Sequence, residues 1–493
     1  MQPALFNWTS RKSSLFLAVF LFLTLIIYYL LHGRYVLYNG DDAWTMTRLY
    51  HYSKTGINMD TIFRAVTTDE RVQIFNQLFN VIYTGYLQVF GWTKSNAHIL
   101  CTAFMFGATL VWYHIIKALK FSNTLAVIFA LTMLLFPAYF GTANLIRTDP
   151  MTFFLSAVCF LLFIKKRYFW SAFVGLMAVE THPMGIIAAF YILAYVSANW
   201  KYFFGKDQEW RKVLLPAVAG VGLGIAYYVA LHWHVLSWER FEKTLLDNRN
   251  NAKELPSYLI TYFAQTEWYL HLWELFLLLG TIIWYIAKRG WRTQPIVWTL
   301  LLMMILSTFV TGRPNRVYMV FIFPAFQLML LYTAEQAGKL KMWTFLLMVL
   351  FILHYGNVYR MNHSFNHGAV HKKTEALIPD KSIPVVGMAD NWFPAKDHKF
   401  HLIYNSINDL VDQPFKAFYL IENEYLHIAP FSIKIEEWAL EEKLTGDALI
   451  LKRKKHYQKT IAYFKANYDC QNIGRFRAYL DGVVQVNYCK TKK

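Results

Sequence analysis

The chain has 493 residues, of which 56% are hydrophobic, 18% aromatic and only 16% charged, and its mean hydropathy is +0.27. Soluble domains carry about a quarter charged residues, so this composition excludes a soluble enzyme, a disordered chain and a small disulfide-stapled protein. The net charge of +18 at pH 7 would suggest a nucleic-acid partner on a soluble protein. However, apolar runs recur from residue 13 to residue 356, and they predict an integral membrane protein with many spans.

The excess positive charge lies mainly in short turns between the apolar runs. The last 137 residues carry 20 Lys and Arg and 15 Asp and Glu, so the first 356 residues hold most of the excess. Cytoplasmic loops of membrane proteins carry such a surplus of Lys and Arg. No basic stripe interleaved with aromatic residues occurs, and we therefore expect membrane lipids but no nucleic acid as partners. The basic turns are Arg11-Lys12, Lys117 with Lys120, Lys165-Lys166-Arg167, Arg211-Lys212, Lys288-Arg289, and Lys339 with Lys341.

A run of about 20 apolar residues crosses a bilayer as a helix, because a helix satisfies its own backbone in lipid. The first run follows Arg11-Lys12 and no small-residue cleavage site comes after it, which predicts a retained helix and not a signal peptide. The predicted spans are 13–32, 76–92, 97–116, 123–143, 150–164, 168–182, 184–199, 213–234, 270–287, 295–311, 315–333 and 341–356.

Placing the basic turns in the cytoplasm predicts about 11 to 13 transmembrane helices, with the N-terminus inside and the C-terminus outside. The first outer loop is then 33–76, and the 235–269 loop is also outside. Segment 76–92 breaks this alternation if it crosses fully. Either 76–92 is re-entrant, or another crossing lies nearby. We expect an inner (plasma) membrane of a bacterium, with the C-terminal region periplasmic or extracellular.

The chain changes character after residue 356, where prolines separate short alternating stretches. We therefore predict a transmembrane domain over 1–356 and an extracytoplasmic mixed α/β domain over 357–493. Ala448–Arg453 predicts a strand. Residues 475–488 predict a β-hairpin that turns at Asp481-Gly482, because Asp-Gly supplies the positive φ angles of a tight turn.

The four cysteines fall into two pairs. Cys101 and Cys159 sit in apolar runs and are expected to be small buried hydrophobes. Cys470 and Cys489 flank the predicted hairpin, and in an oxidising compartment they can form a disulfide. Two free thiols are the alternative.

The most informative polar stretch is Asp41-Asp42-Ala43-Trp44, just after the first predicted span. Adjacent carboxylates raise each other's pKa, so one could accept a proton while the other positions a partner. The alternative is that Asp41 or Asp42 only caps the helix predicted from Ala43 to Tyr52.

Two further polar stretches lie at predicted outer ends of spans. In Arg147-Thr148-Asp149-Pro150, Arg147 is a candidate phosphate ligand, while Asp149 and Pro150 also suit the start of a helix. In Glu180-Thr181-His182-Pro183, ionisable groups lie at membrane depth, where they are costly and often functional. His182 is equally compatible with a ligand and with a plain helix-end residue.

A fourth candidate is Arg313-Pro314-Asn315-Arg316, where two guanidinium groups would match a phosphate or diphosphate headgroup. Ordinary anchoring to lipid headgroups is the alternative. No metal cluster has convincing spacing, so the sequence firmly implies no cofactor; a divalent metal stays open as an alternative without support from a motif. A phosphate-binding Gly-rich loop and a Gly-x-Ser-x-Gly motif are also missing from the sequence, which argues against nucleotide or serine hydrolysis.

The acidic pair with its following Ala-Trp, the Phe90-Gly91 end of the next segment, and Arg147–Pro150 after a helix pair form a recognisable arrangement. Over about residues 10–335 it resembles the membrane glycosyltransferases of the GT-C fold, in the branch of the protein O-mannosyltransferases and aminoarabinose-lipid A transferases. The C-terminal region carries no such resemblance. A His-Pro-Pro or Lys-Pro element of many relatives is missing, because the corresponding stretch reads Glu70-Arg71-Val72-Gln73.

The resemblance implies transfer of a sugar from a polyprenyl-phosphate donor to a glycan, lipid or protein acceptor on the outer face. It implies that Asp41 or Asp42 is the catalytic base. Substrate-binding candidates are Arg147, Asp149, His182, Arg313 and Arg316. Two other functions stay open: a transporter or flippase for a lipid-linked glycan, and a polysaccharide polymerase or ligase that would use the basic 235–269 loop. The absence of an internal repeat argues against the transporter.

Overall fold

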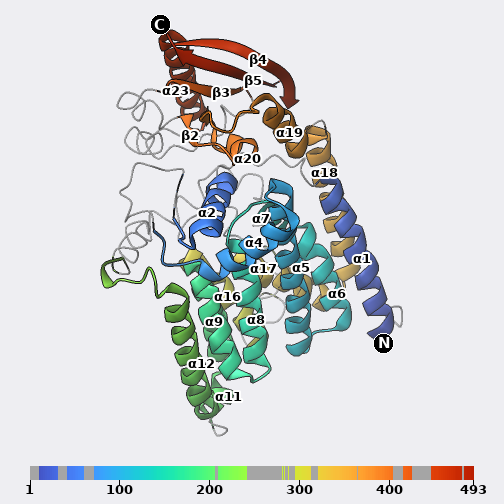
Figure 1. The fold of residues 1–493 in the computed structure, drawn as a ribbon. Coiled ribbons are helices and arrows are strands. Elements are labelled where there is room, and N and C mark those ends of the chain that lie inside the picture. The colour runs from blue at the N-terminus through green and yellow to red at the C-terminus, as the bar shows by residue number, and fades with distance from the viewer. Residues whose placement is uncertain are drawn as a thin grey trace.

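The computed structural model describes residues 10–31, 41–59, 61, 72–205, 209–240, 242, 280, 283, 287, 295–311, 320–363, 365–403, 415–424, 446–479 and 482–492. In these ranges a bundle of helices carries a small domain of strands and helices at one end (Figure 1). The predicted site residues Arg313 and Arg316 lie outside them, as does most of the predicted span 270–287.

The bundle and the polar segments between its helices contain α1 (Ser10–Leu31), α2 (Asp41–Thr55), α4 (Gln77–Phe90), α5 (Lys94–Ala118), α6 (Asn123–Leu135), α7 (Pro137–Ala143), α8 (Asp149–Ile164), α9 (Tyr168–Thr181), η2 (Pro183–Ile186), α10 (Ile187–Ala198), α11 (Trp200–Phe204), α12 (Glu209–His232), α16 (Pro295–Thr311), α17 (Phe323–Gln336) and α18 (Leu340–Asn362). The C-terminal domain contains α19 (His367–Leu377), β1 (Val385–Gly387), η5 (Ala389–Asn391), α20 (Trp392–Ala395), β2 (Phe400–Leu402), β3 (Ala417–Asn423), α23 (Gly446–Asn467), β4 (Tyr468–Tyr479) and β5 (Gly482–Thr491).

Most predicted spans within the described ranges are helices with nearly the predicted bounds. By length and composition, α5, α12 and the Leu340–Arg360 part of α18 are long and apolar enough to cross a membrane. One predicted span is wrong in detail, because 123–143 is two helices and not one. Pro137 begins the second helix and Phe136 has extended backbone angles, since proline has no N–H to continue the preceding hydrogen-bond ladder.

Helix α4 shows whether segment 76–92 crosses the bundle from end to end. The backbone N–H of Gln77, its first residue, donates to Glu180 at the end of α9. Soon after α4 ends, Lys94 contacts Asp42 of α2 and Asp390 of the C-terminal domain. Both ends of α4 therefore lie at the same end of the bundle, and its 14 residues span only about 21 Å, less than a bilayer core. The structure favours the alternative in which this segment does not cross.

Two glycines let α12 approach α9 closely. A Cβ atom on Gly220 would lie 2.2 Å from the carbonyl oxygen of Phe169, and one on Gly224 would lie 2.5 Å from a methyl group of Leu176. Such small residues at four-residue spacing are typical of helix pairs in membranes, where close backbone packing replaces the hydrophobic effect. This packing places the end of α12 next to the end of α9.

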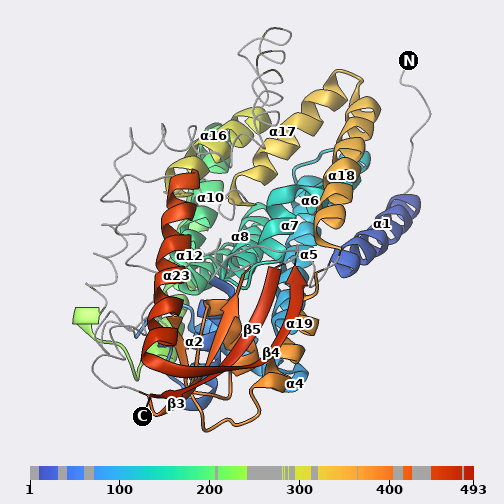
Figure 2. The same cartoon turned by 90° about the horizontal axis from the view of Figure 1, so that it is seen from above.

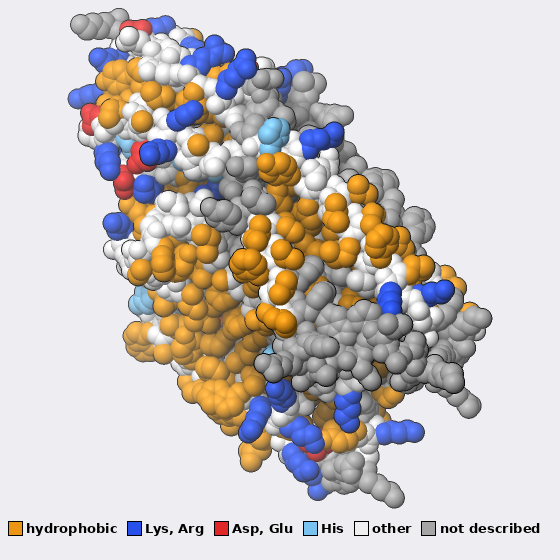
Figure 3. All heavy atoms as spheres, turned by 90° about the vertical axis from the view of Figure 1, so that its right-hand side faces the viewer, with side chains coloured by type: hydrophobic (Ala, Val, Ile, Leu, Met, Phe, Trp, Pro, Cys, Tyr) orange, Lys and Arg blue, Asp and Glu red, His pale blue; other side chains and the backbone are white. Residues whose placement is uncertain are grey.

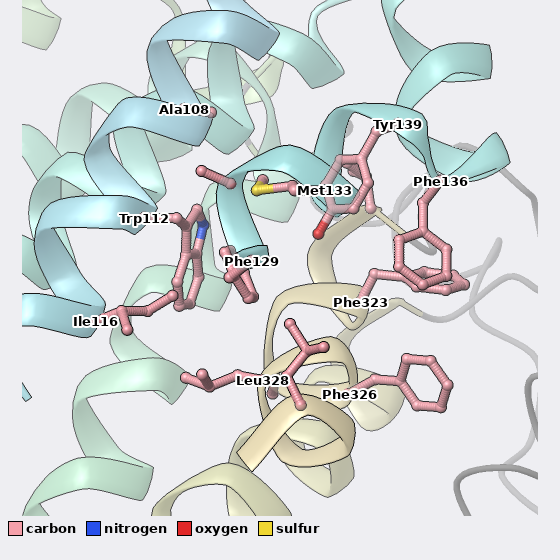
Figure 4. Packing of buried hydrophobic residues seen from close by; sticks show 14 of the residues in the cluster. Ala108, Trp112, Ile116, Phe129, Met133, Phe136, Tyr139, Phe323, Phe326 and Leu328 are labelled. Carbon is pink, nitrogen blue, oxygen red and sulfur yellow. The ribbon is translucent and has the colours of Figure 1, made fainter. Parts of the chain in front are cut away.

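Large aromatic side chains fill the bundle core (Figure 4). Trp112 of α5 packs on Phe129 of α6, and Phe136 packs on Phe323 of α17, with ring centroids 6.2 and 5.5 Å apart. Each of these side chains is buried. The polar Gln327 of α17 lies in the same core, and its amide donates to the carbonyl oxygen of Phe129.

The outside of the bundle is apolar. Figure 3 shows a broad hydrophobic belt on one face, with Lys and Arg side chains gathered at both ends of it. On α1 and α18, Phe22, Phe345 and Ile352 are 63%, 67% and 68% exposed. An exposed apolar belt between two charged ends is what contact with lipid requires. The chain is an integral membrane protein.

The C-terminal domain is built on a mixed five-stranded sheet of order β2-β1-β3-β5-β4. β1 pairs in parallel with β2 and β3, whereas β5 pairs antiparallel with β3 and β4. The predicted hairpin is confirmed as β4 and β5. Cys470 and Cys489 face each other across it and form a disulfide. The predicted strand Ala448–Arg453 is wrong, because these residues belong to the helix α23 (Figure 2). Phe464 of this helix packs on Phe418 of β3.

A separate hydrophobic cluster joins the two parts of the molecule. Met46 and Leu49 of α2 and Phe79 of α4 share it with Trp392 and Phe393 of α20. The ring of Tyr50 packs on Trp392, and its hydroxyl donates to Asp397 at 3.0 Å. The C-terminal domain therefore packs on the helix that follows the first span, next to the acidic pair.

Candidate active site

The predicted polar stretches meet at the bundle end that carries the C-terminal domain. The starts of α2, α4, α5 and α8 lie there, together with the ends of α9 and α12, because side chains at these positions contact one another. Helix starts present unpaired N–H groups and a partial positive charge, so this end favours anionic groups. Buried carboxylates occupy it: Asp42, Asp149 and Glu180.

Asp42 is 1% exposed and both of its oxygens have partners. Oδ1 accepts the backbone N–H of Ile146 at 2.7 Å, in the turn before α8. Oδ2 lies 3.2 Å from Nζ of Lys94 and 3.3 Å from Nε2 of His98, both on the first two turns of α5. Asp42 therefore holds α2 against α5 and the turn before α8.

Lys94 links this cluster to the C-terminal domain. Its Nζ also lies 2.8 Å from Oδ1 of Asp390 in η5, and its side chain is 5% exposed. Asp390 in turn accepts from Nε2 of His371 at 3.0 Å. One buried ammonium is thus shared by two carboxylates that are far apart in the sequence.

The two carboxylates of this cluster are both held in their ionised forms. Burial would raise the pKa of Asp42, but Lys94, His98 and the Ile146 N–H together hold that pKa below its usual value. Burial acts on Asp390 in the same direction, and Lys94 and His371 outweigh it, so the pKa of Asp390 lies well below its usual value. Asp42 is therefore a weak base with little access to solvent.

The second polar stretch forms an ion pair at the start of α8. Nε of Arg147 lies 2.7 Å from Oδ2 of Asp149, and Asp149 is completely buried in the first turn of the helix. Its other oxygen, Oδ1, has no hydrogen-bond partner among the described residues. Arg147 keeps 16% of its side chain exposed. A phosphate could reach this guanidinium without entering the core.

In the third stretch, Glu180–Pro183, the polar side chains cap neighbouring helices. The Glu180 carboxylate accepts the N–H groups of Gln77 and Leu78 and so caps α4. Nδ1 of His182 accepts the N–H of Met184 and caps η2. His182 also interacts electrostatically with Asp149, Arg147 and Arg48 of α2, so three predicted stretches do converge at this end.

The remaining predicted residues are less defined. Asp41 is the first residue of α2, directly before the anchored Asp42. Its side chain, like Arg313 and Arg316, is outside what the structure describes. These three residues therefore stay predictions that rest on the sequence.

Sequence reasoning missed Lys94, His98 and Asp390, which complete the cluster around Asp42. It also missed His367 and His371, which the structure places beside Asp390. The His-x3-His spacing was a signal for the last two, because residues four positions apart share one face if the segment is helical. Nothing in the sequence links Lys94 to Asp390, because 296 positions separate them.

The bundle, its polar end and the attached sheet domain define a polytopic membrane protein with an extramembrane domain seated over a charged site. No known protein family matches the sequence, and no curated protein matches it. The fold is similar to that of ArnT from Cupriavidus metallidurans bound to undecaprenyl phosphate, with a TM-score of 0.56 and 11% identity over 96% of this chain and 98% of ArnT.

The apo form of the same ArnT gives a TM-score of 0.53 at 11% identity, with the same coverage of both chains. AglB, an oligosaccharyltransferase from Archaeoglobus fulgidus in complex with an inhibitory peptide and a dolichol phosphate, gives a TM-score of 0.48 at 11% identity, over 97% of this chain and 74% of AglB. ArnT, an aminoarabinose-lipid A transferase, has the GT-C fold. This chain has that fold over nearly its whole length, C-terminal domain included.

Proposed function

We propose that this protein is a glycosyltransferase that moves a sugar from a polyprenyl-phosphate carrier to an acceptor at the bundle end next to the C-terminal domain. The observation that carries the proposal is the anchored acidic pair. Asp42 fixes the start of α2 against α5 and the turn at Ile146, so Asp41 begins a helix at the polar end of a GT-C bundle. The ArnT structure with undecaprenyl phosphate supports a lipid-phosphate donor.

Asp41 is the base in this proposal, and Asp42 is a positioning residue. Each oxygen of Asp42 is already engaged, and its pKa is lowered, which makes it a poor proton acceptor. The carboxylate of Asp41 takes the proton of an acceptor hydroxyl as that oxygen attacks the anomeric carbon. The bond between the anomeric carbon and the phosphate oxygen breaks, its electron pair leaves with the polyprenyl phosphate, and the configuration inverts.

The departing phosphate gains negative charge, and cations at the site stabilise it. Arg147 is partly exposed at the start of α8 and supplies one fork of donors. We propose that Arg313 and Arg316 supply others, on the evidence of the sequence. Asp149 fixes the Arg147 guanidinium through their ion pair, and His182 lies in the same charged group.

The proposed orientation puts this end of the bundle on the outer face of a bacterial inner membrane. One of the basic turns, Lys165-Lys166-Arg167, lies between α8 and α9, at the ends of these helices remote from Asp149 and Glu180. The disulfide between Cys470 and Cys489 in the C-terminal domain fits an oxidising compartment. A reporter fused after the last residue should be active outside the cytoplasm, and cytoplasmic activity would contradict this orientation.

The test of the function is product identification in cells. Lipid, glycan and protein fractions from cells with the gene, without it, and with an Asp41→Asn copy are compared by mass spectrometry. We expect one sugar-bearing product that only the wild-type gene restores. The proposal fails if all three cell types give the same products while the wild-type protein is present in the membrane.

A further inference from the structure

Three potential metal ligands converge at the base of the C-terminal domain, beside the charged site. His367 and His371 are one turn apart at the start of α19, and Asp390 is in η5. Residues four positions apart lie on the same face of a helix, so both imidazoles point toward Asp390. Nε2 of His371 is 3.0 Å from Oδ2 of Asp390, and Nδ1 of His367 is 4.0 Å from the same oxygen. One ligand atom from each residue lies within 4.8 Å of the others.

An ordinary ion pair does not account for this group. The contact between His371 and Asp390 could be a plain hydrogen bond, but His367 is 5% exposed and neither of its ring nitrogens has a hydrogen-bond partner among the described residues. Buried polar groups in folded proteins are nearly always satisfied, and a buried imidazole without a partner is costly. His367 is therefore placed as a ligand would be.

The spacing fits a small divalent transition-metal ion. Ligand atoms about 2.0–2.2 Å from a tetrahedral zinc ion lie about 3.3 Å from each other, and the separations of 3.0 and 4.0 Å bracket that value. Two imidazoles and one carboxylate favour Zn²⁺ and similar ions over Ca²⁺ or Mg²⁺, which prefer oxygen ligands. We propose that His367, His371 and Asp390 form a binding site for a divalent transition-metal ion, Zn²⁺ above all.

The surroundings support the three ligands. Nζ of Lys94 holds Oδ1 of Asp390, which leaves Oδ2 for the metal, in the way that outer partners orient metal ligands. The ring of His371 stacks on Phe393 at 5.2 Å, and His367 packs edge-on against Phe365 at 4.5 Å. Side chains of His371 and Asp390 are 14% and 15% exposed, which gives an ion and a water ligand a way in.

A metal here is a structural clamp. It joins α19 to η5. Asp390 of η5 also contacts Lys94 of α5, which contacts Asp42, so the metal ion indirectly stabilises the position of the domain on the bundle. The metal is not part of the proposed sugar transfer, and the site stands whether or not that activity is found. Binding to the folded state alone raises stability by mass action, so the ion should raise the melting temperature.

The experiment uses the full chain, purified in detergent without a polyhistidine tag and stripped with a chelator. Zn²⁺ or Co²⁺ is titrated, bound metal is counted by mass spectrometry, and the visible absorption of Co²⁺ reports nitrogen and oxygen ligation. We expect one ion per chain and a melting temperature higher by about 2 °C or more. His371→Ala should weaken binding by at least about 100-fold, since it removes a direct ligand.

His363→Ala is the matched control, because His363 is an exposed histidine four residues before His367. It should bind the ion as the wild type does. His367→Gln keeps the volume of the buried side chain and guards against misfolding of an alanine variant. The proposal is overturned if the wild type binds no ion, or if His371→Ala and His367→Gln bind it as tightly as His363→Ala.

Discussion

Asp42 is buried and Asp390 is partly buried beside the ammonium of Lys94, and their surroundings differ. Asp42 belongs to α2, and its other partners, His98 and the N–H of Ile146, belong to the bundle. Asp390 belongs to η5, and its other neighbours are the two imidazoles of α19. Lys94 therefore links two carboxylates. The other partners of Asp42 are in the helical bundle, and the other neighbours of Asp390 are in the C-terminal domain.

This difference separates two roles for similar side chains. The contacts of Asp42 use both of its oxygens, which is the arrangement of an anchor. The contacts of Asp390 leave His367 without a hydrogen-bond partner in the described parts of the chain, which is the arrangement of a ligand site. We therefore assign the proposed base to Asp41, which precedes Asp42, and the proposed metal site to Asp390 with its two histidines.

The largest expected effect comes from Asp41→Asn. Removal of a general base lowers turnover by about 10²- to 10⁴-fold, and the melting temperature should stay near that of the wild type. Asp42→Asn is the matched comparison. It should lower the melting temperature and keep measurable turnover, because an amide oxygen can still accept the N–H of Ile146. Turnover is measured with the cellular product as readout, and melting by intrinsic fluorescence.

The separation of base and anchor would be wrong if Asp42→Asn abolished turnover without loss of stability while Asp41→Asn remained active. In that outcome the two aspartates would exchange roles.

Lys94→Met tests the link between the two groups. It leaves the buried Asp42 and the partly buried Asp390 without their shared cation, and breaking a buried ion pair in this way costs about 3–5 kcal/mol. Lys117→Met on the same helix is the control, because Lys117 is exposed and should cost less than about 1 kcal/mol. The comparison is made by thermal and urea unfolding in detergent. Equal effects of the two substitutions would show that Lys94 is no bridge.

The pH dependence of stability gives a smaller effect. The pKa values of Asp42 and Asp390 are both lower in the folded protein than their usual value of 3.8. Their contribution to stability is therefore complete above about pH 5 and is lost as the pH falls below 3.8. The difference in melting temperature between wild type and Lys94→Met should narrow over that acid range. If the difference in melting temperature stayed constant from pH 7 to pH 3, Asp42 and Asp390 would not form ionised pairs with Lys94.

The smallest effect is expected from Tyr50→Phe, which removes the hydrogen bond from α2 to Asp397 in the C-terminal domain. This contact is exposed, so its loss should cost about 0.5–1 kcal/mol, with no change in turnover or metal binding. A larger loss would mean that the rim of the interface, and not the Lys94 bridge, holds the domain in place. The measurement is the urea midpoint of the variant against wild type.

The sequence predicts the helical part of the fold well, because long apolar runs have few alternatives in a membrane. Pro137 was visible in the sequence, yet hydropathy does not register a break inside an apolar run. Ala448–Arg453 fails as a strand because its short apolar run starts a 22-residue helix, α23, whose Phe464 and Tyr457 pack on the domain core.

The candidate site is predictable only in part. Asp42, Arg147, Asp149 and His182 were found because charge is rare in apolar surroundings. Their arrangement in space could not be predicted, because contacts between distant residues set it. Asp42 and Ile146 are 104 positions apart, and Lys94 and Asp390 are 296 positions apart. His367 and His371 have a visible spacing, but their third ligand comes from a different segment, so no local motif contains all three.

The most direct measurement of the proposed function uses the purified protein in liposomes with labelled polyprenyl-phosphate sugars and acceptor fractions from the host. We predict that wild-type protein releases free polyprenyl phosphate and labels the acceptor, and that Asp41→Asn does neither while Lys117→Met does both. Movement of the intact labelled lipid between leaflets, without release of polyprenyl phosphate, would contradict glycosyl transfer and identify a lipid-linked sugar transporter.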